Sequence, residues 1–117
     1  MKKKLVYIAG KLNDDAVKYL FNINLMLTIG SYVRKRGFLA FTPCNDLLNG
    51  IHGGDMFYSD YAETNMAILE RSDAVFLVPN WETSNGTKAE IKRAKELNIP
   101  IFENIDKLVE WRDNETK

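Results

Sequence analysis

Four short apolar runs alternate with longer amphipathic segments along this chain, and this alternation limits the possible folds more than any other feature. The apolar runs are LVYIA at 5–9, FLAFTP at 38–43, DAVFLVP at 73–79 and IPIFE at 99–103. Continuous apolar runs of this kind are typical of strands buried on both faces of a parallel sheet. The segments between them predict helices at 13–36, 59–71, 86 or 87–97 and 104–112. This βαβαβαβα order predicts an α/β fold with a four-stranded parallel sheet and helices on both faces.

The length and charge of the chain limit the number of its domains and the kinds of partner it can bind. Its 117 residues fit one globular domain spanning 1–117. The 16 Lys and Arg residues balance the 16 Asp and Glu residues, so no net field draws the chain to polymeric nucleic acid or to an anionic membrane. No apolar run approaches the roughly 20 residues of a membrane span, and the basic start of the chain indicates a first strand instead of a signal peptide.

The cysteine and histidine content argues against a metal site. A single cysteine, Cys44, excludes an intrachain disulfide and any zinc site built on several thiolates. The single histidine, His52, lies beside two glycines and cannot join a histidine cluster. We therefore expect no metal and no cofactor, and a cytoplasmic location where a lone thiol stays reduced.

The first predicted helix carries more apolar surface than one sheet face requires. Asn13, Asp14 and Asp15 are its candidate N-caps, and Gly37 is its expected C-terminal stop. Two apolar stripes follow its length. The first consists of Val17, Leu20, Phe21 and Leu27, and the second of Tyr19, Ile23, Met26, Ile29 and Val33. Because one stripe is enough to cover a sheet, the other predicts a homodimer or higher homo-oligomer contact, unless the second helix covers it.

The expected ligand site lies at the carboxyl ends of the strands, where the strand order of such sheets reverses. Three segments meet this requirement: 10–15, 44–58 and 80–90. Neither a G-x-G-x-x-G motif after the first strand nor a G-x-x-x-x-G-K-[ST] motif is present, so any phosphate needs a different cradle.

Glu90 has two interpretations in this pattern. In one, Thr87-Lys-Ala-Glu90 is a capping box that satisfies the first free N–H groups of the third helix. In the other, Glu90 projects from the first turn of that helix into the ligand crevice, while the helix N-terminus attracts an anion. Ser84, Asn85, Gly86 and Thr87 would then offer hydroxyl and N–H groups to that anion.

Two stretches resemble a known superfamily. VYIAG at 6–10 and SDAVFLVPNWETSNGTKAEIKRAKELNIPIF at 72–102 are similar to the nucleoside 2-deoxyribosyltransferase-like superfamily, in particular to its short members of the DUF4406 type. The pattern there is a strand ending in AG, then D-A, an apolar run, P-G-W-x-x-S-x-G-A-x-x-E and a later G-I-P. The matching residues are Asp73, Pro79, Trp81, Ser84, Gly86, Glu90, Ala94, Ile99 and Pro100. The resemblance implies a flavodoxin-like, Rossmannoid three-layer fold and enzymes, related to 2′-deoxynucleoside 5′-phosphate N-hydrolases, that cleave the N-glycosidic bond of nucleosides or nucleotides.

The resemblance also implies roles for individual residues. Glu90 stands at the position of the nucleophile, which forms a glycosyl-enzyme intermediate and passes the sugar to water or to a second base. Tyr7 matches a tyrosine that orients that glutamate or contacts the sugar, although a packed strand tyrosine is an equal alternative. Ser84 matches the serine that binds phosphate in nucleoside 5′-monophosphate N-hydrolases. Gly10, Gly86 and Thr87 are expected to lie against the substrate, and Trp81 to support the loop or line the pocket.

Two departures from the family pattern bear on activity. Asn65 stands where the family has an acid that protonates or contacts the leaving base, and an amide cannot deliver a proton. The proton would then have to come from another residue: His52, Asp55, Asp60 or Glu63. Lys11 replaces the proline of the usual AGP, and either contacts phosphate or is solvated.

These features leave three hypotheses of different class. The first is an enzyme that acts on a nucleoside 5′-monophosphate through Glu90. The second is a binding protein, a sensor, sponge or regulator, that holds a nucleotide without turnover because Asn65 has replaced the acid. The third is a structural or interaction domain in which Glu90 is only a helix cap. The glycine-rich loop 44–58, with Met56, Phe57 and Tyr58, could close over a base in either of the first two cases or be an ordinary surface loop.

Overall fold

The computed structural model of the protein describes residues 2–12, 15–45 and 58–115, apart from the side chains of residues 45 and 58–61. Its central element is a four-stranded sheet in which every neighbouring pair of strands is parallel. The strands are β1 (Leu5–Ala9), β2 (Leu39–Phe41), β3 (Ala74–Leu77) and β4 (Ile101–Phe102). The predicted α/β class and the parallel sheet are therefore confirmed.

The strands are arranged in the order β2-β1-β3-β4. This is the order of flavodoxin-like folds, in which the chain winds outward from β1 in one direction and from β3 in the other. The direction of winding reverses between β1 and β3, because the chain after β1 leads to α1 on one face of the sheet and the chain after β3 leads to α4 on the other. A crevice for a ligand is expected at that point.

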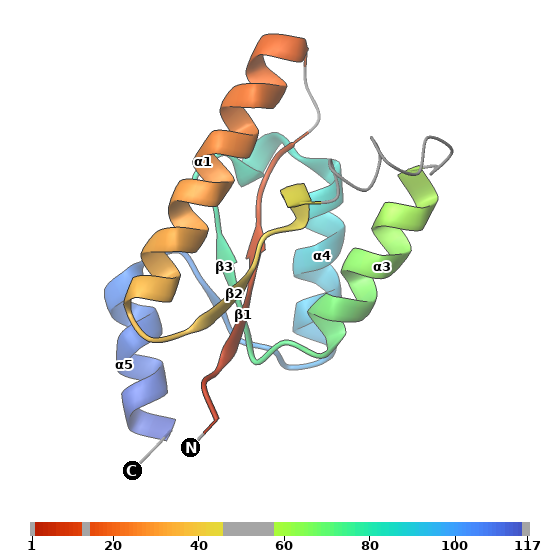
Figure 1. Ribbon diagram of the computed structural model, residues 1–117. Helices are drawn as coiled ribbons and strands as arrows, with labels where there is room; N and C mark the ends of the chain where they lie inside the picture. The colour runs from red at the N-terminus through yellow and green to blue at the C-terminus, as the bar shows by residue number, and fades with distance from the viewer. Residues whose placement is uncertain (1, 13–14, 46–57, 116–117) are drawn as a thin grey trace.

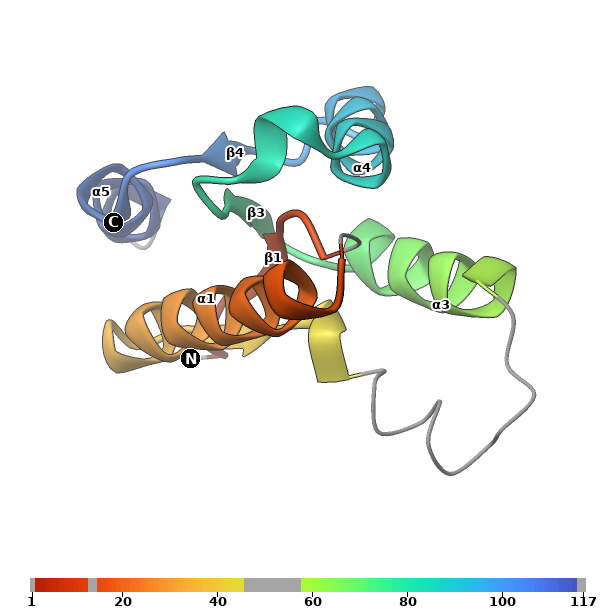
Figure 2. The same ribbon diagram turned by 90° about the horizontal axis from the view of Figure 1, so that it is seen from above.

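Helices cover both faces of the sheet and complete three layers (Figures 1 and 2). The helices α1 (Ala16–Lys35) and α5 (Ile105–Glu115) lie on one face, and α3 (Tyr58–Glu70) and α4 (Asn85–Glu96) lie on the other. Two short 3₁₀ turns, η1 (Pro43–Asn45) and η2 (Trp81–Thr83), follow β2 and β3. None of the described helices is long and apolar enough to cross a membrane.

Alternate residues of β1 divide the core into two clusters, because successive side chains of a strand point to opposite faces. Val6 and Ile8 pack with α1 and α5, in a cluster that includes Met26, Val33 and Leu108. Tyr7 and Ala9 pack toward α3 and α4, in a cluster that includes Leu69 and Ala94. Since β1 is fully buried from Val6 to Ala9, any polar atom on these side chains needs a partner inside the protein.

The two apolar stripes of α1 have different environments. Met26 and Val33, from the second stripe, are buried against the sheet. The first stripe faces outward, with Leu20 and Phe21 64% and 66% exposed. The predicted alternative, that the second helix covers this stripe, is wrong, because α3 packs beside α4 on the other face of the sheet.

Both ends of α1 agree with the sequence prediction, whereas β4 and the segment after β3 differ from it. Of the candidate caps of α1, Asp15 caps the helix. Its carboxylate accepts a hydrogen bond from Lys18 N at 3.0 Å, while residues 13 and 14 lie outside the described residues. Gly37 follows the helix with φ +94°, the left-handed conformation expected of its stop. β4 has two residues instead of five, although the carbonyl of Pro100 still accepts from Val75 N at 2.9 Å. The turn η2 was not predicted.

Candidate active site

Glu90 lies in the second turn of α4 and is half-buried. The helix begins at Asn85, and its N-cap is Ser84, whose hydroxyl oxygen accepts from Thr87 N at 3.1 Å. Glu90 is therefore the sixth residue of the helix, beyond the free N–H groups of the first turn. The predicted capping box of Thr87 and Glu90 is wrong, as is the first-turn placement of Glu90, because Ser84 caps the helix three residues before Thr87.

The partner of Glu90 is Tyr7, in the middle of β1. The Tyr7 hydroxyl donates a hydrogen bond to the Glu90 carboxylate across the interface between the sheet and α4. Tyr7 is completely buried, and its ring packs against Phe41 with the ring centroids 5.6 Å apart. The structure therefore brings together the two residues that sequence reasoning had assigned to catalysis.

The environment of Glu90 changes its acidity. Burial raises the pKa of Glu90 from 4.5 to about 7, because desolvation disfavours the charged form, while the hydrogen bond from Tyr7 acts in the opposite direction. At neutral pH the protonated and ionised forms are then similarly populated. A carboxyl group that titrates near the operating pH is suited to nucleophilic or acid–base chemistry.

The loops after β1 and β3 are in direct contact at the reversal point of the sheet. A Cβ atom on Gly10 would lie 2.6 Å from Cβ of Val78, so only glycine permits this approach. The amide oxygen of Asn80 accepts from Lys11 N at 3.0 Å, and Asn80 Nδ2 donates to Oδ1 of Asn22 at 3.1 Å. Three segments distant in sequence therefore meet through the side chain of Asn80.

Polar groups collect at the N-terminus of α4. Lys11 Nζ donates to Thr83 Oγ1 at 3.1 Å, next to the N-cap residue. Ser84 Oγ accepts a second hydrogen bond, from Thr87 Oγ1 at 2.9 Å. Gly86, in the first turn, is exposed. An ammonium, a hydroxyl and a helix N-terminus in one place can bind an anion.

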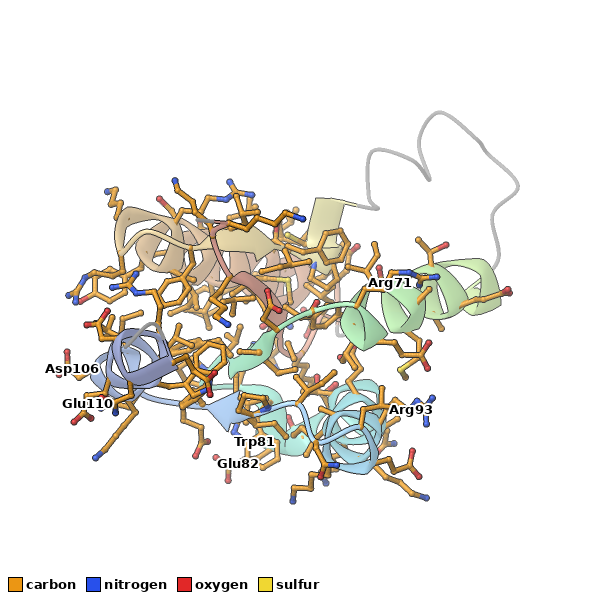
Figure 3. All side chains as sticks on the ribbon, turned by 90° about the horizontal axis from the view of Figure 1, so that it is seen from below. Arg71, Trp81, Glu82, Arg93, Asp106 and Glu110 are labelled. Atoms are coloured by element: carbon orange, nitrogen blue, oxygen red, sulfur yellow. The ribbon has the colours of Figure 1, made fainter. Side chains whose placement is uncertain are left out.

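Trp81, in η2, is half-buried beside β4 and the start of α4 (Figure 3). Its ring packs against the cluster that contains Tyr7. Its Nε1–H donates to Oε1 of Glu103 at 2.8 Å, which ties η2 to the residue after β4. Trp81 therefore supports the loop that precedes α4, one of the two roles expected for it.

Asn65 lies on α3, four residues before Leu69, and thus on the helix face that packs toward Tyr7. Its Oδ1 is buried and has no hydrogen-bond partner among the described residues. Among the described residues, no hydrogen bond joins Asn65 to Glu90. Of the alternative proton donors, Glu63 is exposed, while His52, Asp55 and the side chain of Asp60 lie outside the described residues, as does most of the loop 44–58.

Asp73 matches the family pattern, but its contacts are structural. Its carboxylate accepts from Leu5 N at 2.7 Å, and its own N–H donates to Leu5 O at 2.8 Å, at the amino ends of β1 and β3. This position is at the opposite edge of the sheet from Glu90. In the described part of the chain, no group of three or more His, Cys, Asp and Glu side chains could hold a metal ion.

Sequence reasoning missed Asn22, Asn80 and Glu103. Asn80 had a signal, because the family pattern has glycine at that position in P-G-W. Asn22 and Glu103 had none, since their partners are 58 and 22 residues away in sequence and belong to other elements.

The fold and the site define a flavodoxin-like α/β protein with a buried Tyr–Glu pair beside the reversal point of a parallel sheet. Residues 4–103 match the family described as "Domain of unknown function (DUF4406)". The chain therefore belongs to the DUF4406 family. The matched region covers all four strands and every site residue described above. No curated protein matches the chain.

Proposed function

We propose that this protein cleaves or transfers the N-glycosidic bond of a nucleoside 5′-monophosphate, with Glu90 as the nucleophile. The observation that carries the proposal is the half-buried Glu90, hydrogen-bonded to Tyr7 and with its pKa raised to about 7. The resemblance to the nucleoside 2-deoxyribosyltransferase-like superfamily supplies the reaction class.

A purely structural role explains this pair poorly. Burying a carboxylate costs several kcal/mol in real proteins, and a neutral amide would accept the Tyr7 hydrogen bond without that cost. The pair also lies near the carboxyl edge of the sheet, where ligands of this fold class bind. Buried groups with perturbed pKa values at such positions are candidates for catalysis.

In the proposed reaction, the ionised Glu90 carboxylate attacks C1′ of the sugar while the C1′–N bond breaks. The electron pair of that bond leaves with the base nitrogen, which takes a proton from solvent water because the amide of Asn65 cannot supply one. Water, or the nitrogen of a second base, then attacks C1′ of the glycosyl ester and loses its proton to solvent, and Glu90 leaves as a carboxylate. Tyr7 holds the carboxylate in place and stabilises its charge before attack and after release.

The proposed substrate carries a phosphate because the polar groups near α4 suit an anion. Lys11 contributes a positive charge and Ser84 a hydroxyl, beside the positive end of the helix dipole. Ser84 and Glu90 are six residues apart, which is about 9 Å of rise along an α-helix. One ligand could therefore reach both groups, with its phosphate at Ser84 and its reacting carbon at Glu90.

The test is to incubate the protein with a panel of ribo- and deoxyribonucleoside monophosphates, the matching nucleosides and NAD, and to measure free base by chromatography. Adding a second base distinguishes transfer from hydrolysis. Glu90→Gln should abolish base release and leave the fold intact. Glu96→Gln, on the same helix and 51% exposed, is the matched control and should have no effect. Base release by the Glu90→Gln variant at the wild-type rate would overturn the assignment.

A second candidate function is nucleotide binding without turnover. Asn65 favours it, because its buried Oδ1 lacks a donor and could accept one from a base, yet an amide cannot protonate the leaving nitrogen. Calorimetric binding of a monophosphate, with no base released from any member of the panel, would support this candidate. Base release by an Asn65→Asp variant alone would show that the missing acid is the reason.

We extend the proposal to a cytoplasmic homodimer formed through the outward stripe of α1. No charged residue occurs between Lys18 and Arg34, so this face can meet its own copy without like-charge repulsion. Exposed apolar patches of this kind commonly mark interaction surfaces.

A further inference from the structure

The outward face of α1 repeats with the spacing of a helix–helix seam. Its positions 17, 20, 24, 27 and 31 alternate between steps of three and four residues, which is the a and d spacing of a coiled-coil heptad. All five residues of this seam are exposed: Val17, Leu20, Asn24, Leu27 and Ser31. The seam extends over two heptads, so it is long enough to pack against another helix.

The seam lies opposite the face of α1 that packs on the sheet. The buried residues of α1 are Asn22, Met26, Gly30 and Val33. At about 100° per residue, their mean direction is about 150° away from that of the seam. Val17 is 78% exposed and Leu27 is 45% exposed, although both side chains are large and apolar. Within the described part of the chain, the sheet and the other helices therefore leave the seam open to solvent.

The partner that fits this face is a second copy of the same chain. No charged residue occurs from Tyr19 to Val33, so two copies of α1 can meet without burying an ion, whereas a charged partner would find no counter-ion on the seam. Asn24 lies at the centre of the seam, seven residues from Val17 and seven from Ser31. An amide group carries both a donor and an acceptor, so Asn24 can pair with its own copy across a two-fold axis.

The charges at the two ends of α1 decide the direction of the pairing. Two aspartates and one lysine in residues 13–18 give the N-terminal end a net charge of −1, and Arg34, Lys35 and Arg36 give the C-terminal end a net charge of +3. Parallel helices would place the two clusters of cations side by side. Antiparallel helices place each basic end beside the acidic end of the other copy, and they also bring opposite ends of the two helix dipoles together.

We propose that α1 pairs with α1 of a second copy in the antiparallel direction, about a two-fold axis that passes beside Asn24. In this arrangement Val17 lies beside the partner's Ser31, and Leu20 packs against the partner's Leu27. The inference deepens the proposed homodimer by giving its geometry. It rests on that part of the proposed function and is independent of the reaction at Glu90.

The orientation is tested by disulfide cross-linking in a Cys44→Ala background, which removes the one natural thiol of the chain. A disulfide requires Cα atoms within about 7 Å of each other. Asn24→Cys alone should give a covalent dimer on mild oxidation, because position 24 lies at the axis. Val17→Cys and Ser31→Cys should each remain a monomer on a denaturing gel, since two copies of position 17 would be about 21 Å apart along the helices. An equal mixture of these two variants should cross-link.

A second measurement uses sedimentation and keeps the natural cysteine. The wild-type protein should sediment as a dimer. Asn24→Asp places two like charges across the axis and should raise the dimer dissociation constant at pH 8 about tenfold or more. Asn98→Asp is the matched control, because it makes the same substitution in the turn after α4, on the other face of the sheet (Figure 2). It should leave the dissociation constant unchanged.

The outcomes separate this inference from the earlier proposals. A wild-type protein that is monomeric up to millimolar concentration overturns both the homodimer and its geometry. Self-cross-linking of Val17→Cys would show a parallel pair, and a dimer in which no variant cross-links would use another surface, so either result overturns the geometry alone. Base release enters none of these measurements, so the inference is tested even when the enzymatic proposal has failed.

Discussion

Replacing Tyr7 by Phe isolates the contribution of one hydroxyl to the chemistry of Glu90. The phenylalanine keeps the completely buried ring and its packing against Phe41, so the sheet should be undisturbed. The variant removes the hydroxyl that donates to Glu90, and with it the hydrogen bond that opposes the effect of burial on the pKa of Glu90. The pKa of Glu90 must therefore rise further above its value of about 7.

The size of this effect follows from the charge of the acceptor. A hydrogen bond to a charged group is worth about 1.5–3 kcal/mol, and 1.36 kcal/mol is a tenfold change in a protonation equilibrium. Part of this hydrogen-bond energy remains when the carboxyl is protonated, so the difference between the two protonation states is near the lower end of that range. Tyr7→Phe should move the acid limb of kcat/KM upward by about one pH unit or more. At pH 7 the ionised fraction, and with it the rate, should fall by a factor of about five to ten.

The assay is base release between pH 5.5 and 9.5, together with an NMR titration of ¹³C-labelled glutamate in which Glu90→Gln identifies the signal. Tyr32→Phe is the matched control, because Tyr32 is 45% exposed and its hydroxyl contacts Arg36 on the far end of α1. An unchanged acid limb and an unchanged Glu90 titration in Tyr7→Phe would refute the reasoning. A uniform loss of rate at every pH would instead indicate that Tyr7 contacts the sugar of the substrate.

Three further predictions concern Glu90, Ser84 and the exposed stripe of α1. Because the pKa of Glu90 is raised from 4.5 to about 7, the folded state holds the proton more tightly than the unfolded chain, and stability falls as pH rises through that window. Glu90→Gln should therefore increase the unfolding free energy by about 2–3 kcal/mol at pH 8 and have little effect at pH 4, measured by urea unfolding. Destabilisation at both pH values would show that the ionised carboxylate stabilises the fold and would contradict a raised pKa. Ser84→Asp keeps a good N-cap residue but places a carboxylate at the proposed phosphate contact. The calorimetric affinity for a monophosphate should fall about tenfold or more, while the affinity for the matching nucleoside persists. An equal change in both affinities would mean that the phosphate binds elsewhere. Leu20→Glu should convert a dimer to a monomer in sedimentation experiments, whereas Leu97→Glu, at a 38% exposed site on the far side of the sheet, should not; a wild-type monomer would remove the dimer from the proposal.

The strands and helices were predictable because their signals are local. Each strand is a continuous apolar run, and each helix is marked by a cap or a stop such as Asp15 or Gly37. The strand order was not predictable from these patterns, since no local signal states which strands become neighbours. The length of β4 was not predictable either, because its apolar run is longer than the two residues that form the strand.

The candidate site was predictable only at the positions where a family pattern marks it. Tyr7, Ser84 and Glu90 lie where the pattern places them, but the pattern does not state which hydroxyl caps α4. Ser84 and Thr87 are three residues apart and both are good N-cap residues, so sequence alone could not decide between them. The start of the helix shows which residue is the cap. A helix that begins at Asn85 is capped by Ser84, buries Thr87 and places Glu90 in the second turn, facing Tyr7.

One local conflict lies in the candidate site, and the proposed substrate would relieve it. The half-buried carboxylate of Glu90 has lost part of its hydration, and this burial raises its pKa to about 7. A glycosyl ester at Glu90 would remove that charge for the lifetime of the intermediate. Sequences that fold well rarely retain such a conflict without a function. A ligand with an electrophilic carbon at Glu90 accounts for the conflict, whereas a merely anionic ligand leaves the cost of burying this carboxylate unexplained.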